Sequence, residues 1–326
     1  ETRGMIDARR IALMKPTMLL VNCARGGIID EEALVEALKE RRIAGAALDV
    51  FSVEPLPADH PLRSLDNVVL TPHLAASTTE AQEKVAEQIA EQIRDALTGG
   101  VIRNAVNAPS VDPKTYAQIR EVIDLCERMG TFISQVMPAA LKELSVVFSG
   151  TKARHPSTPL VTALLKGYLR NVVSEPVNDV NATYRARQLG IKVSETRTDE
   201  TDDVYAGMIS VQMRADEENC RIHEISATLD ARRRPHLVKI NGRRIDAVPE
   251  GQMLVIENRD VPGVVGAVCT AIGRHQINIA SIDWSRGAEA GSTALTVINI
   301  DHPVTPELMQ EIEELDNIIW ARAVLI

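Results

Sequence analysis

Short apolar runs alternate with amphipathic stretches through the first 110 residues. Three of these runs predict strands, and the first is continuous except for Asn22, as expected of a strand covered on both faces. The predicted strands are Met18–Cys23, Ala46–Phe51 and Val68–Leu70. Because strands that alternate with helices favour a parallel arrangement, this region is predicted to form an α/β sheet.

Helical periodicity fills the intervals between those runs. A short helix is predicted over Ile6–Leu13, and a second one follows Asp30, whose side chain suits an N-cap. Ser77 and Glu80 form an S-x-x-E capping box, which predicts a third helix that continues to about Leu97. The apolar stripe of this third helix could pack against another helix.

The pattern changes at residues 105–113 and again near residue 251, which predicts three domains at 1–110, 113–250 and 251–326. The first change falls in AVNAPSVDP, which is rich in proline and small or polar residues, as linkers are. The middle region is predicted to be mixed α and β. Its predicted elements are a helix at Tyr116–Val136, strands at Lys142–Gly150 and Ala206–Arg214, and a polar, acidic loop at Thr196–Asp203.

The last region predicts elements in the order βαββαβ, which is the ferredoxin-like split unit. These elements are the strand Met253–Ile256, the helix Val264–Arg274, the strands Asn278–Asp283 and Ala294–Ile300, the helix Pro306–Leu315 and the strand Ile318–Ile326.

Composition narrows the classes of protein. The chain has 326 residues, of which 45% are hydrophobic and 25% charged, as in an ordinary globular protein. Its net charge of −9 argues against nucleic acid or an anionic membrane as partner. No apolar run approaches the ~18 residues needed to span a bilayer. The four cysteines are far apart and form no C-x-x-C, so neither a metal site nor a disulfide framework is indicated, and a reducing cytoplasm is the expected location.

Four polar residues lie at or after the ends of the predicted strands of the first domain. Arg25 lies just after the first strand, Asp49 near the end of the second with Glu54 in the loop beyond it, and His73 just after the third. Ligands of open parallel sheets bind at the carboxyl ends of strands, so these side chains could converge in one cleft. Arginine clamps carboxylates, and histidine exchanges a proton near neutral pH. Together with a glutamate that supports the imidazolium, they suit oxidation of a 2-hydroxy acid. On spacing alone, ordinary loop or capping roles remain the commoner interpretation for each residue.

Three segments of this domain, NCARGGIIDEEAL, ALDVFSVEP and TPHLAASTTEAQ, resemble the cofactor-domain signatures of NAD-dependent D-2-hydroxyacid dehydrogenases. The later segment ENRDVPGVVGAVCTAIGRHQINIASI resembles the ACT domain of the long-form D-3-phosphoglycerate dehydrogenases, a branch of that family. The resemblance implies that residues 1–110 are the C-terminal part of a Rossmann-like NAD-binding domain. It also implies that residues 113–250 are an intervening domain like those called allosteric substrate-binding, and that residues 251–326 are an ACT regulatory domain.

The resemblance also implies roles for single residues. Arg25 would clamp the substrate carboxylate, His73 would be the acid/base, and Glu54 would be its acid partner. Asp49 would lie near the nicotinamide carboxamide. The residues implied to line NAD are Cys23 and Ala24 (by their backbone), Asp49, His73, Ala75 and Ala76. The implied reaction converts 3-phosphoglycerate and NAD to 3-phosphohydroxypyruvate and NADH, the first step of serine synthesis.

Two departures from the family pattern qualify this expectation. The chain contains no G-x-G-x-x-G, and it opens with ETRGMIDARR, without an initiator methionine. We therefore expect an incomplete copy that lacks the N-terminal substrate domain and the Gly-rich cofactor loop, and that does not turn over alone. Ala75 stands where the family often has glycine, and the sequence does not decide what the added methyl group does.

In the last domain, the resemblance implies a serine site at a two-fold interface between ACT domains. Asn258 and Asp260 of one chain and Asn278 of its neighbour would contact L-serine, while Gly263 would allow close backbone approach. The alternative is that Asp260 only caps the following helix and that Asn278 is a turn residue. Arg243, after the turn at 240–242, is a candidate for an anion site, against the alternative of a solvated hairpin.

Two classes of function therefore remain open. One is a dehydrogenase, or part of one, that acts on 3-phosphoglycerate or, less consistently with the C-terminal domains, on glycerate or lactate. The other is a non-catalytic module for amino-acid sensing and oligomerisation. In either case a homodimer or homotetramer is expected, because ACT domains of this kind pair edge to edge and residues 79–97 could pack helix on helix.

Overall fold

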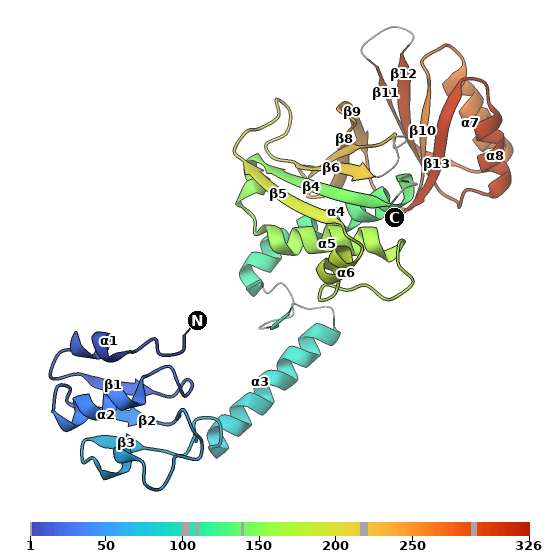
Figure 1. The fold of residues 1–326 in the computed structure, drawn as a ribbon. Coiled ribbons are helices and arrows are strands. Elements are labelled where there is room, and N and C mark those ends of the chain that lie inside the picture. Colours follow the sequence, from blue (N-terminus) through green and yellow to red (C-terminus); the bar gives the residue numbers. More distant parts are fainter. Residues whose placement is uncertain (1, 99–104, 108–110, 138–139, 216–220, 288–291) are drawn as a thin grey trace. The chain divides into compact units, whose positions relative to one another are not determined.

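The computed structural model describes residues 2–98, 105–107, 111–137, 140–215, 221–287 and 292–326. They form two compact units, Glu1–Gly99 and Gly100–Ile326 (Figure 1). Each unit has its own hydrophobic core. No helix in the described ranges is long and apolar enough to cross a membrane.

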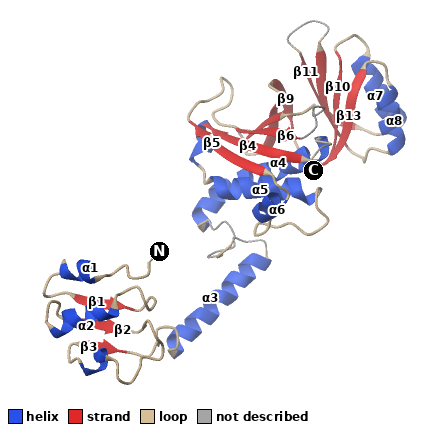
Figure 2. Ribbon diagram, in the orientation of Figure 1, coloured by secondary structure: helices blue, strands red, loops and turns tan. Residues whose placement is uncertain are grey.

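The first unit contains a three-stranded sheet in the order β1-β2-β3 (Figure 2). Leu19 pairs with Gly45 and Ala46 pairs with Val68, and both strand pairs are parallel, which confirms the predicted arrangement. The strands are β1 (Leu19–Asn22), β2 (Gly45–Leu48) and β3 (Val68–Leu70). The helices are α1 (Ala8–Ala12), α2 (Glu31–Lys39), η1 (Pro61–Ser64) and α3 (Thr79–Leu97).

The helix α2 forms where capping and an apolar face coincide. The Asp30 side chain accepts a hydrogen bond from the Ala33 amide at 3.1 Å, as predicted for the N-cap. The buried face of α2 packs into the core of the first unit, which also includes Ile11, Ile43 and Leu62. This packing fixes the turn between β1 and α2, where Arg25 lies.

The helix α3 differs from its prediction in its cap. Thr78, rather than Ser77, is the N-cap, and its hydroxyl accepts from the Ala81 amide at 3.2 Å. The Ser77 amide instead donates to the Leu74 carbonyl, because the chain is still turning at that point. None of the residues of α3 is buried, and its apolar stripe (Val85, Ile89, Ile93 and Leu97) is exposed.

The second unit contains a six-stranded mixed sheet in the order β5-β4-β6-β7-β8-β9. The β4–β5 pair is parallel, and the other pairs are antiparallel. The strands are β4 (Leu141–Ser149), β5 (Lys192–Thr198), β6 (Ile209–Ala215), β7 (Glu224–Leu229), β8 (Pro235–Ile240) and β9 (Arg243–Ala247). The helices are α4 (Pro113–Val136), η2 (Gly150–Arg154), α5 (Ser157–Arg170) and α6 (Ala182–Gln188).

The helices α4 and α5 pack in close contact through two glycines. A Cβ atom at Gly130 would lie 2.0 Å from the Leu164 carbonyl oxygen, and one at Gly167 would lie 2.0 Å from the Glu127 carbonyl oxygen. Only glycine leaves room for this approach. Glu127 also forms ion pairs with Lys166 (2.8 Å) and with Arg170 (2.7 Å). The Asn171 side chain, just after α5, donates to the Ser134 hydroxyl near the end of α4 at 2.9 Å, and the starts of both helices line one cavity, so the two N-termini lie at the same end.

A second, four-stranded antiparallel sheet follows in the order β11-β12-β10-β13, and the chain order βαββαβ confirms the predicted ferredoxin-like unit. Its elements are β10 (Gln252–Arg259), α7 (Val264–Arg274), β11 (Ile279–Arg286), β12 (Thr293–Ile300), α8 (Pro306–Glu314) and β13 (Ile318–Leu325). One face of this sheet packs with α7 and α8. Met253, Val255 and Val324 belong instead to the core cluster of the six-stranded sheet. The division at residue 250 stays a prediction.

Candidate active site

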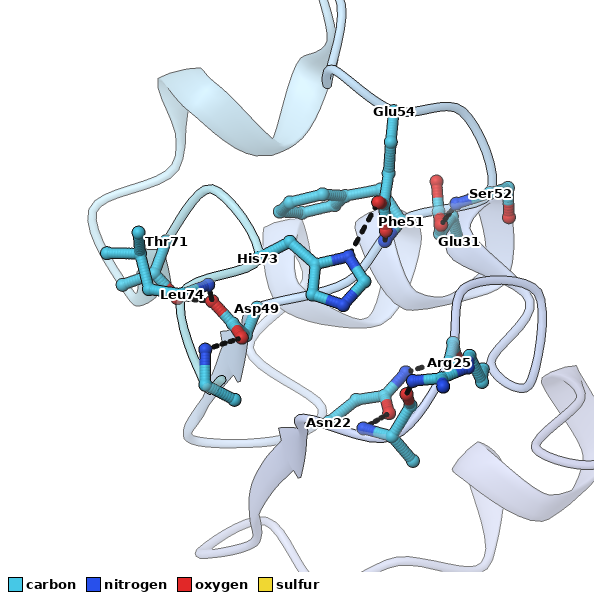
Figure 3. Close-up of polar contacts among 12 residues, drawn as sticks. Asn22, Arg25, Glu31, Asp49, Phe51, Ser52, Glu54, Thr71, His73 and Leu74 are labelled. Carbon is cyan, nitrogen blue, oxygen red and sulfur yellow. Dashed lines mark hydrogen bonds and ion pairs between the residues drawn. The ribbon is translucent and has the colours of Figure 1, made fainter. Parts of the chain in front are cut away.

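The turn after β1 holds Arg25 in a fixed backbone. The Asn22 side chain accepts from the Ala24 amide at 3.1 Å and donates to the Arg25 carbonyl at 3.1 Å. A Cβ atom at Gly26 would lie 1.8 Å from the Phe51 carbonyl oxygen, so glycine is needed there for the turn to reach the loop after β2. The Arg25 side chain is exposed and folds back, and its Nη1 donates to the Ala24 carbonyl at 2.8 Å (Figure 3).

Asp49, at the end of β2, is the hydrogen-bonding centre of the turn that carries His73. Its carboxylate accepts from the Thr71 hydroxyl at 2.5 Å, the Leu74 amide at 2.8 Å and the Ala75 amide at 3.0 Å (Figure 3). These hydrogen bonds, with that of Thr71 the largest, hold the pKa of Asp49 below its ordinary value of 3.8. Asp49 therefore stays ionised at neutral pH, and its three hydrogen bonds hold the turn that carries His73 in place.

His73 and Glu54 are brought together from two different loops. His73 Nδ1 lies 2.7 Å from Glu54 Oε2, and the Phe51 amide donates to Glu54 Oε1 at 3.0 Å (Figure 3). His73 has a φ of 58°, in the left-handed region, which the hydrogen bonds around it hold in place. Both side chains remain partly exposed, with 45% for His73 and 36% for Glu54, so a ligand can reach them.

The hydrogen bond from His73, followed by that from Phe51, holds the pKa of Glu54 below its ordinary value of 4.5. A carboxylate whose pKa is lowered by folding stabilises the folded state at any pH above its pKa in the unfolded chain. This stabilisation is lost as the pH falls through the lowered pKa of the folded state. The Glu54–His73 pair is therefore expected to persist at pH 5 and to break only as the pH falls through the lowered pKa of Glu54, which lies below 4.5. Glu54 is therefore ionised at neutral pH, and its Oε2 can accept a hydrogen bond from His73 Nδ1.

Glu31 is a residue of this site that the sequence pattern did not reveal. It lies in the first turn of α2, where its negative charge is favourable to the helix dipole. Its Oε1 accepts from the Ser52 amide at 2.6 Å, and its Oε2 lies 3.6 Å from His60 Nε2. Glu31 thus anchors the loop that carries Glu54. No local signal could have shown this contact, because its partners are 21 and 29 residues away.

A cavity of about 550 Å³ opens beside the pair and is lined by Phe51, Glu54, Arg63, Thr71 and His73 among others. Its size suits a small organic ligand. Arg25 and Asp49 do not line it. Cys23, Ala24, Ala75 and Ala76 are exposed residues on the turns after β1 and β3. The described residues contain no group of three or more His, Cys, Asp or Glu arranged to hold a metal ion.

Replacing Asp49 by asparagine is expected to loosen the turn that carries His73. The amide would keep one acceptor but would direct its own N–H groups at the Leu74 or Ala75 amide, so at least one donor loses its partner. Hydrogen exchange of these two amides should become roughly tenfold faster or more. Thr71→Val, which removes only the hydroxyl donor, is the matched control and should change their exchange less. Equal exchange in Asp49→Asn and the parent chain would contradict this role.

The residues predicted to bind serine have partners within the chain. Asn258 is buried and its side chain donates to the Arg259 carbonyl at 2.7 Å. Asp260 Oδ2 accepts from Arg286 Nε at 2.7 Å. Asn278 Nδ2 donates a hydrogen bond to Asp301 Oδ2 at 2.7 Å. The alternative that Asp260 caps α7 is wrong, because the N-cap is Gly263, with a φ of 93° and no side-chain cap.

Arg243, the predicted anion-site candidate, begins β9 after the turn at Asn241 and Gly242. Its Nη2 donates to the Thr293 hydroxyl of β12 at 2.5 Å. The residue is partly buried between the two sheets. Arg243 therefore contacts the neighbouring sheet, and an anion role for it stays a prediction.

Comparisons with known families divide the chain as follows. Residues 1–75 match the D-isomer specific 2-hydroxyacid dehydrogenase, NAD binding domain. Residues 118–241 match the D-3-phosphoglycerate dehydrogenase intervening domain, and residues 252–317 match the ACT domain. The first match establishes an NAD-binding domain.

Curated relatives named D-3-phosphoglycerate dehydrogenase align with almost the whole chain. The protein of Methanocaldococcus jannaschii is 37% identical over 318 residues, which are 98% of this chain and 59% of that protein. The protein of Synechocystis sp. is 39% identical over 319 residues, covering 98% of this chain and 56% of that protein. The protein of Bacillus subtilis is 35% identical over 324 residues, covering 99% of this chain and 61% of that protein. The chain thus spans between 56% and 61% of the length of these relatives.

A solved D-isomer specific 2-hydroxyacid dehydrogenase from Xanthobacter autotrophicus Py2, in complex with NADPH and MES, is 43% identical. The alignment covers 35% of this chain and 44% of that one, with a TM-score of 0.29. The chain therefore combines a match to the D-isomer specific 2-hydroxyacid dehydrogenase NAD binding domain with matches to the D-3-phosphoglycerate dehydrogenase intervening domain and the ACT domain, and over almost its whole length it is similar to curated proteins named D-3-phosphoglycerate dehydrogenase.

Proposed function

We propose that this chain provides the acid/base machinery for NAD-dependent oxidation of 3-phospho-D-glycerate to 3-phosphohydroxypyruvate, the first step of L-serine synthesis, in the cytoplasm. The observation that carries the proposal is the 2.7 Å contact between His73 and Glu54 beside the 550 Å³ cavity. A histidine oriented by a carboxylate is the usual arrangement for moving a proton off a hydroxyl group. The relatives' names support the choice of substrate.

The residues would divide the work by their chemistry. His73 would take the proton of the substrate hydroxyl at Nε2, while Glu54 at Nδ1 fixes the tautomer and stabilises the resulting imidazolium. Arg25 would leave the Ala24 carbonyl and clamp the substrate carboxylate. Bound NAD would accept the hydride from the carbon that bears the hydroxyl group. The exposed residues Cys23, Ala24, Ala75 and Ala76 fit the nicotinamide end of that cofactor, and Asp49 would act by holding the His73 turn.

The remainder of the cofactor site would have to come from residues outside this sequence, because the chain contains no G-x-G-x-x-G. A chimera tests this directly. The part of the Bacillus subtilis relative that lies outside its match would be joined to residues 1–326. We expect the chimera to reduce NAD with 3-phosphoglycerate, and the 326-residue chain alone to give no turnover.

The outcomes of this experiment separate the candidate functions. A folded chimera that binds NADH but leaves 3-phosphoglycerate unoxidised would contradict the catalytic proposal and favour a sensing and oligomerisation module. Faster oxidation of D-glycerate or D-lactate would point to another D-2-hydroxyacid dehydrogenase. Turnover by residues 1–326 alone at the chimera's rate would show that they supply a complete cofactor site.

We also propose that the ACT region binds L-serine in a homodimer or homotetramer through Asn258, Asp260, Gly263 and Asn278. The match of residues 252–317 to the ACT domain supports this proposal. The Asp260 side chain is 5% exposed and its carboxylate is paired with Arg286 at 2.7 Å, so it would have to turn away from Arg286 to meet the ammonium of an amino acid. Calorimetry of the full chain should show saturable heat with L-serine. Asp260→Asn should weaken the binding by about tenfold or more. Asp316→Asn, at an exposed position of the same region, should not.

Light scattering on the same samples checks the assembly. No heat at millimolar L-serine, with the chain folded and dimeric, would contradict the serine site. A stable monomer at micromolar concentration would contradict the oligomer.

A further inference from the structure

A second cavity lies in the unit Gly100–Ile326, at the end of the six-stranded sheet where α4 and α5 begin. Its volume is about 750 Å³. Three elements line it: the start of α4, the loop from η2 into α5, and the edge strand β5. It shares no lining residue with the cavity beside His73, and Arg243 does not line it.

The lining of this cavity is basic in a chain of net charge −9. Arg154, His155 and Arg197 all border it. Arg154 is exposed and has no hydrogen bond or ion pair with any described residue. Arg197 donates to the Ser157 hydroxyl at 2.8 Å, so its guanidinium is held at the cavity without a compensating carboxylate among the described residues.

The acidic residue in the described lining, Asp112, does not neutralise these charges. Its Oδ1 accepts from the Lys114 amide at 3.1 Å and the Thr115 amide at 3.0 Å, as the N-cap of α4. These interactions, with the Thr115 side chain first, hold its pKa below 3.8. Asp112 is therefore ionised and hydrogen-bonded to the start of α4, and it forms no ion pair with Arg154 or Arg197. The two arginines outnumber this one carboxylate in the described lining, and their N–H groups remain available for an external anion.

Two further cations, Lys152 and Arg233, lie close enough to His155 to act on its charge. Burial, followed by the charges of Lys152 and Arg233, lowers the pKa of His155 below its ordinary value of 6.5. Burial, followed by the charge of Arg233, likewise lowers the pKa of Lys152 below 10.5. Arg233 has its own carboxylate, Glu121, at 2.7 Å, whereas the Lys152 ammonium forms no hydrogen bond or ion pair with a described residue. The uncompensated positive charge is concentrated on the loop between β4 and α5.

The start of α5 adds donors to this charge. Its N-cap is Pro156, which has no side-chain cap, so the amides of Ser157 and Thr158 lack the usual acceptor. The positive end of the helix dipole points the same way. Thr158 lines the cavity and contributes a hydroxyl group. Backbone amides, a hydroxyl and two arginines together form the donor set that recognises phosphate oxygens.

We propose that this cavity, bordered by Arg154, His155 and Arg197, is a binding site for the phosphate group of a small phosphorylated metabolite. The guanidinium group of arginine is planar, and two of its N–H groups can donate together to two oxygens of one phosphate. The volume of about 750 Å³ leaves room for an organic part beside the phosphate. The site is independent of the catalytic proposal, because it uses no residue of the first unit.

The test is a titration of the full chain with inorganic phosphate and, separately, with glycerol 3-phosphate. Calorimetry measures the affinity, and NMR follows the ring signals of His155, which are assigned by their loss in His155→Gln. We expect saturable binding that shifts the His155 signals. Arg154→Gln should weaken this binding by about tenfold, and it should leave the fold intact because Arg154 has no partner among the described residues.

Two matched variants make the test specific. Arg187→Gln removes an exposed positive charge from α6, outside this cavity, and should leave the affinity unchanged. Arg25→Gln should also leave it unchanged, which separates this site from the catalytic one. Tighter binding of glycerol 3-phosphate than of phosphate identifies a phosphorylated metabolite as the ligand, and equal binding identifies free phosphate. Unmoved His155 signals, or an Arg154→Gln chain that binds as tightly as the parent, would overturn the proposal.

Discussion

His73→Asn in the chimera should lower turnover of 3-phosphoglycerate by about 10²- to 10⁴-fold, the range that a positioned acid/base contributes. Asparagine is close to histidine in size, so the turn should keep its shape. It cannot take a proton, however, and Glu54 would then orient a group without acid/base function. The rate of NADH formation at saturating substrate measures the effect, and a smaller loss is expected in Glu54→Gln, because the glutamine can still accept a hydrogen bond.

The control for this prediction is His302→Asn, which removes an exposed histidine from the second unit and should leave turnover unchanged. The affinities of the chimera for substrate and for NADH are measured separately. If His73→Asn only distorted the fold, these affinities would fall together with turnover. Turnover in His73→Asn within a factor of about three of the parent chimera would refute His73 as the acid/base, since it falls far outside the range expected for that role.

Gly26→Ala should destabilise the first unit by about 3 kcal/mol, at the upper end of the cost of overpacking. The added Cβ would lie 1.8 Å from the Phe51 carbonyl oxygen and 2.9 Å from the Ser52 amide nitrogen. Both atoms belong to the backbone, so no side chain can move aside. The same loop carries Glu54, and the turn would separate from it. Hydrogen exchange of the β2 amides should accelerate by roughly 100-fold.

The chain offers two internal controls for this experiment. Gly27→Ala tests the neighbouring position, where φ is 78° but the nearest atom, Arg3 Cγ, is 4.0 Å away. The strain of φ alone should cost only about 1 kcal/mol. The two tryptophans, Trp284 and Trp320, both lie in the second unit, so their fluorescence on unfolding in urea should not change in either variant. Equal effects of the two alanines would contradict the collision with Phe51.

The middle region shows where the sequence pattern was insufficient. The helix α5 was not predicted, because most of its residues are buried in the core that it shares with α4 and the six-stranded sheet, so it lacks a broad polar face. The strand β5 was missed for the opposite reason. It is exposed, has no apolar alternation, and forms by pairing with β4 at the edge of the sheet, so the predicted loop at Thr196–Asp203 is wrong over its first three residues.

The sequence by itself determined the elements whose partners are near in the chain. The helix α7 begins and ends at the predicted residues, and the βαββαβ order was visible in apolar periodicity alone. The sequence also predicted that Arg25, Glu54 and His73 lie at the carboxyl ends of strands, because their positions follow from where the apolar runs end.

Only the tertiary structure decided which groups hold these residues in place. Asp49 reaches the Leu74 amide across 25 residues, and Glu31 reaches the Ser52 amide across 21. Such contacts depend on how the turns after neighbouring strands pack, and no local pattern encodes that distance. The basic cavity beside α5 has the same origin. Arg154 and Arg197 lie 43 residues apart, and parallel pairing of β4 with β5 brings them together.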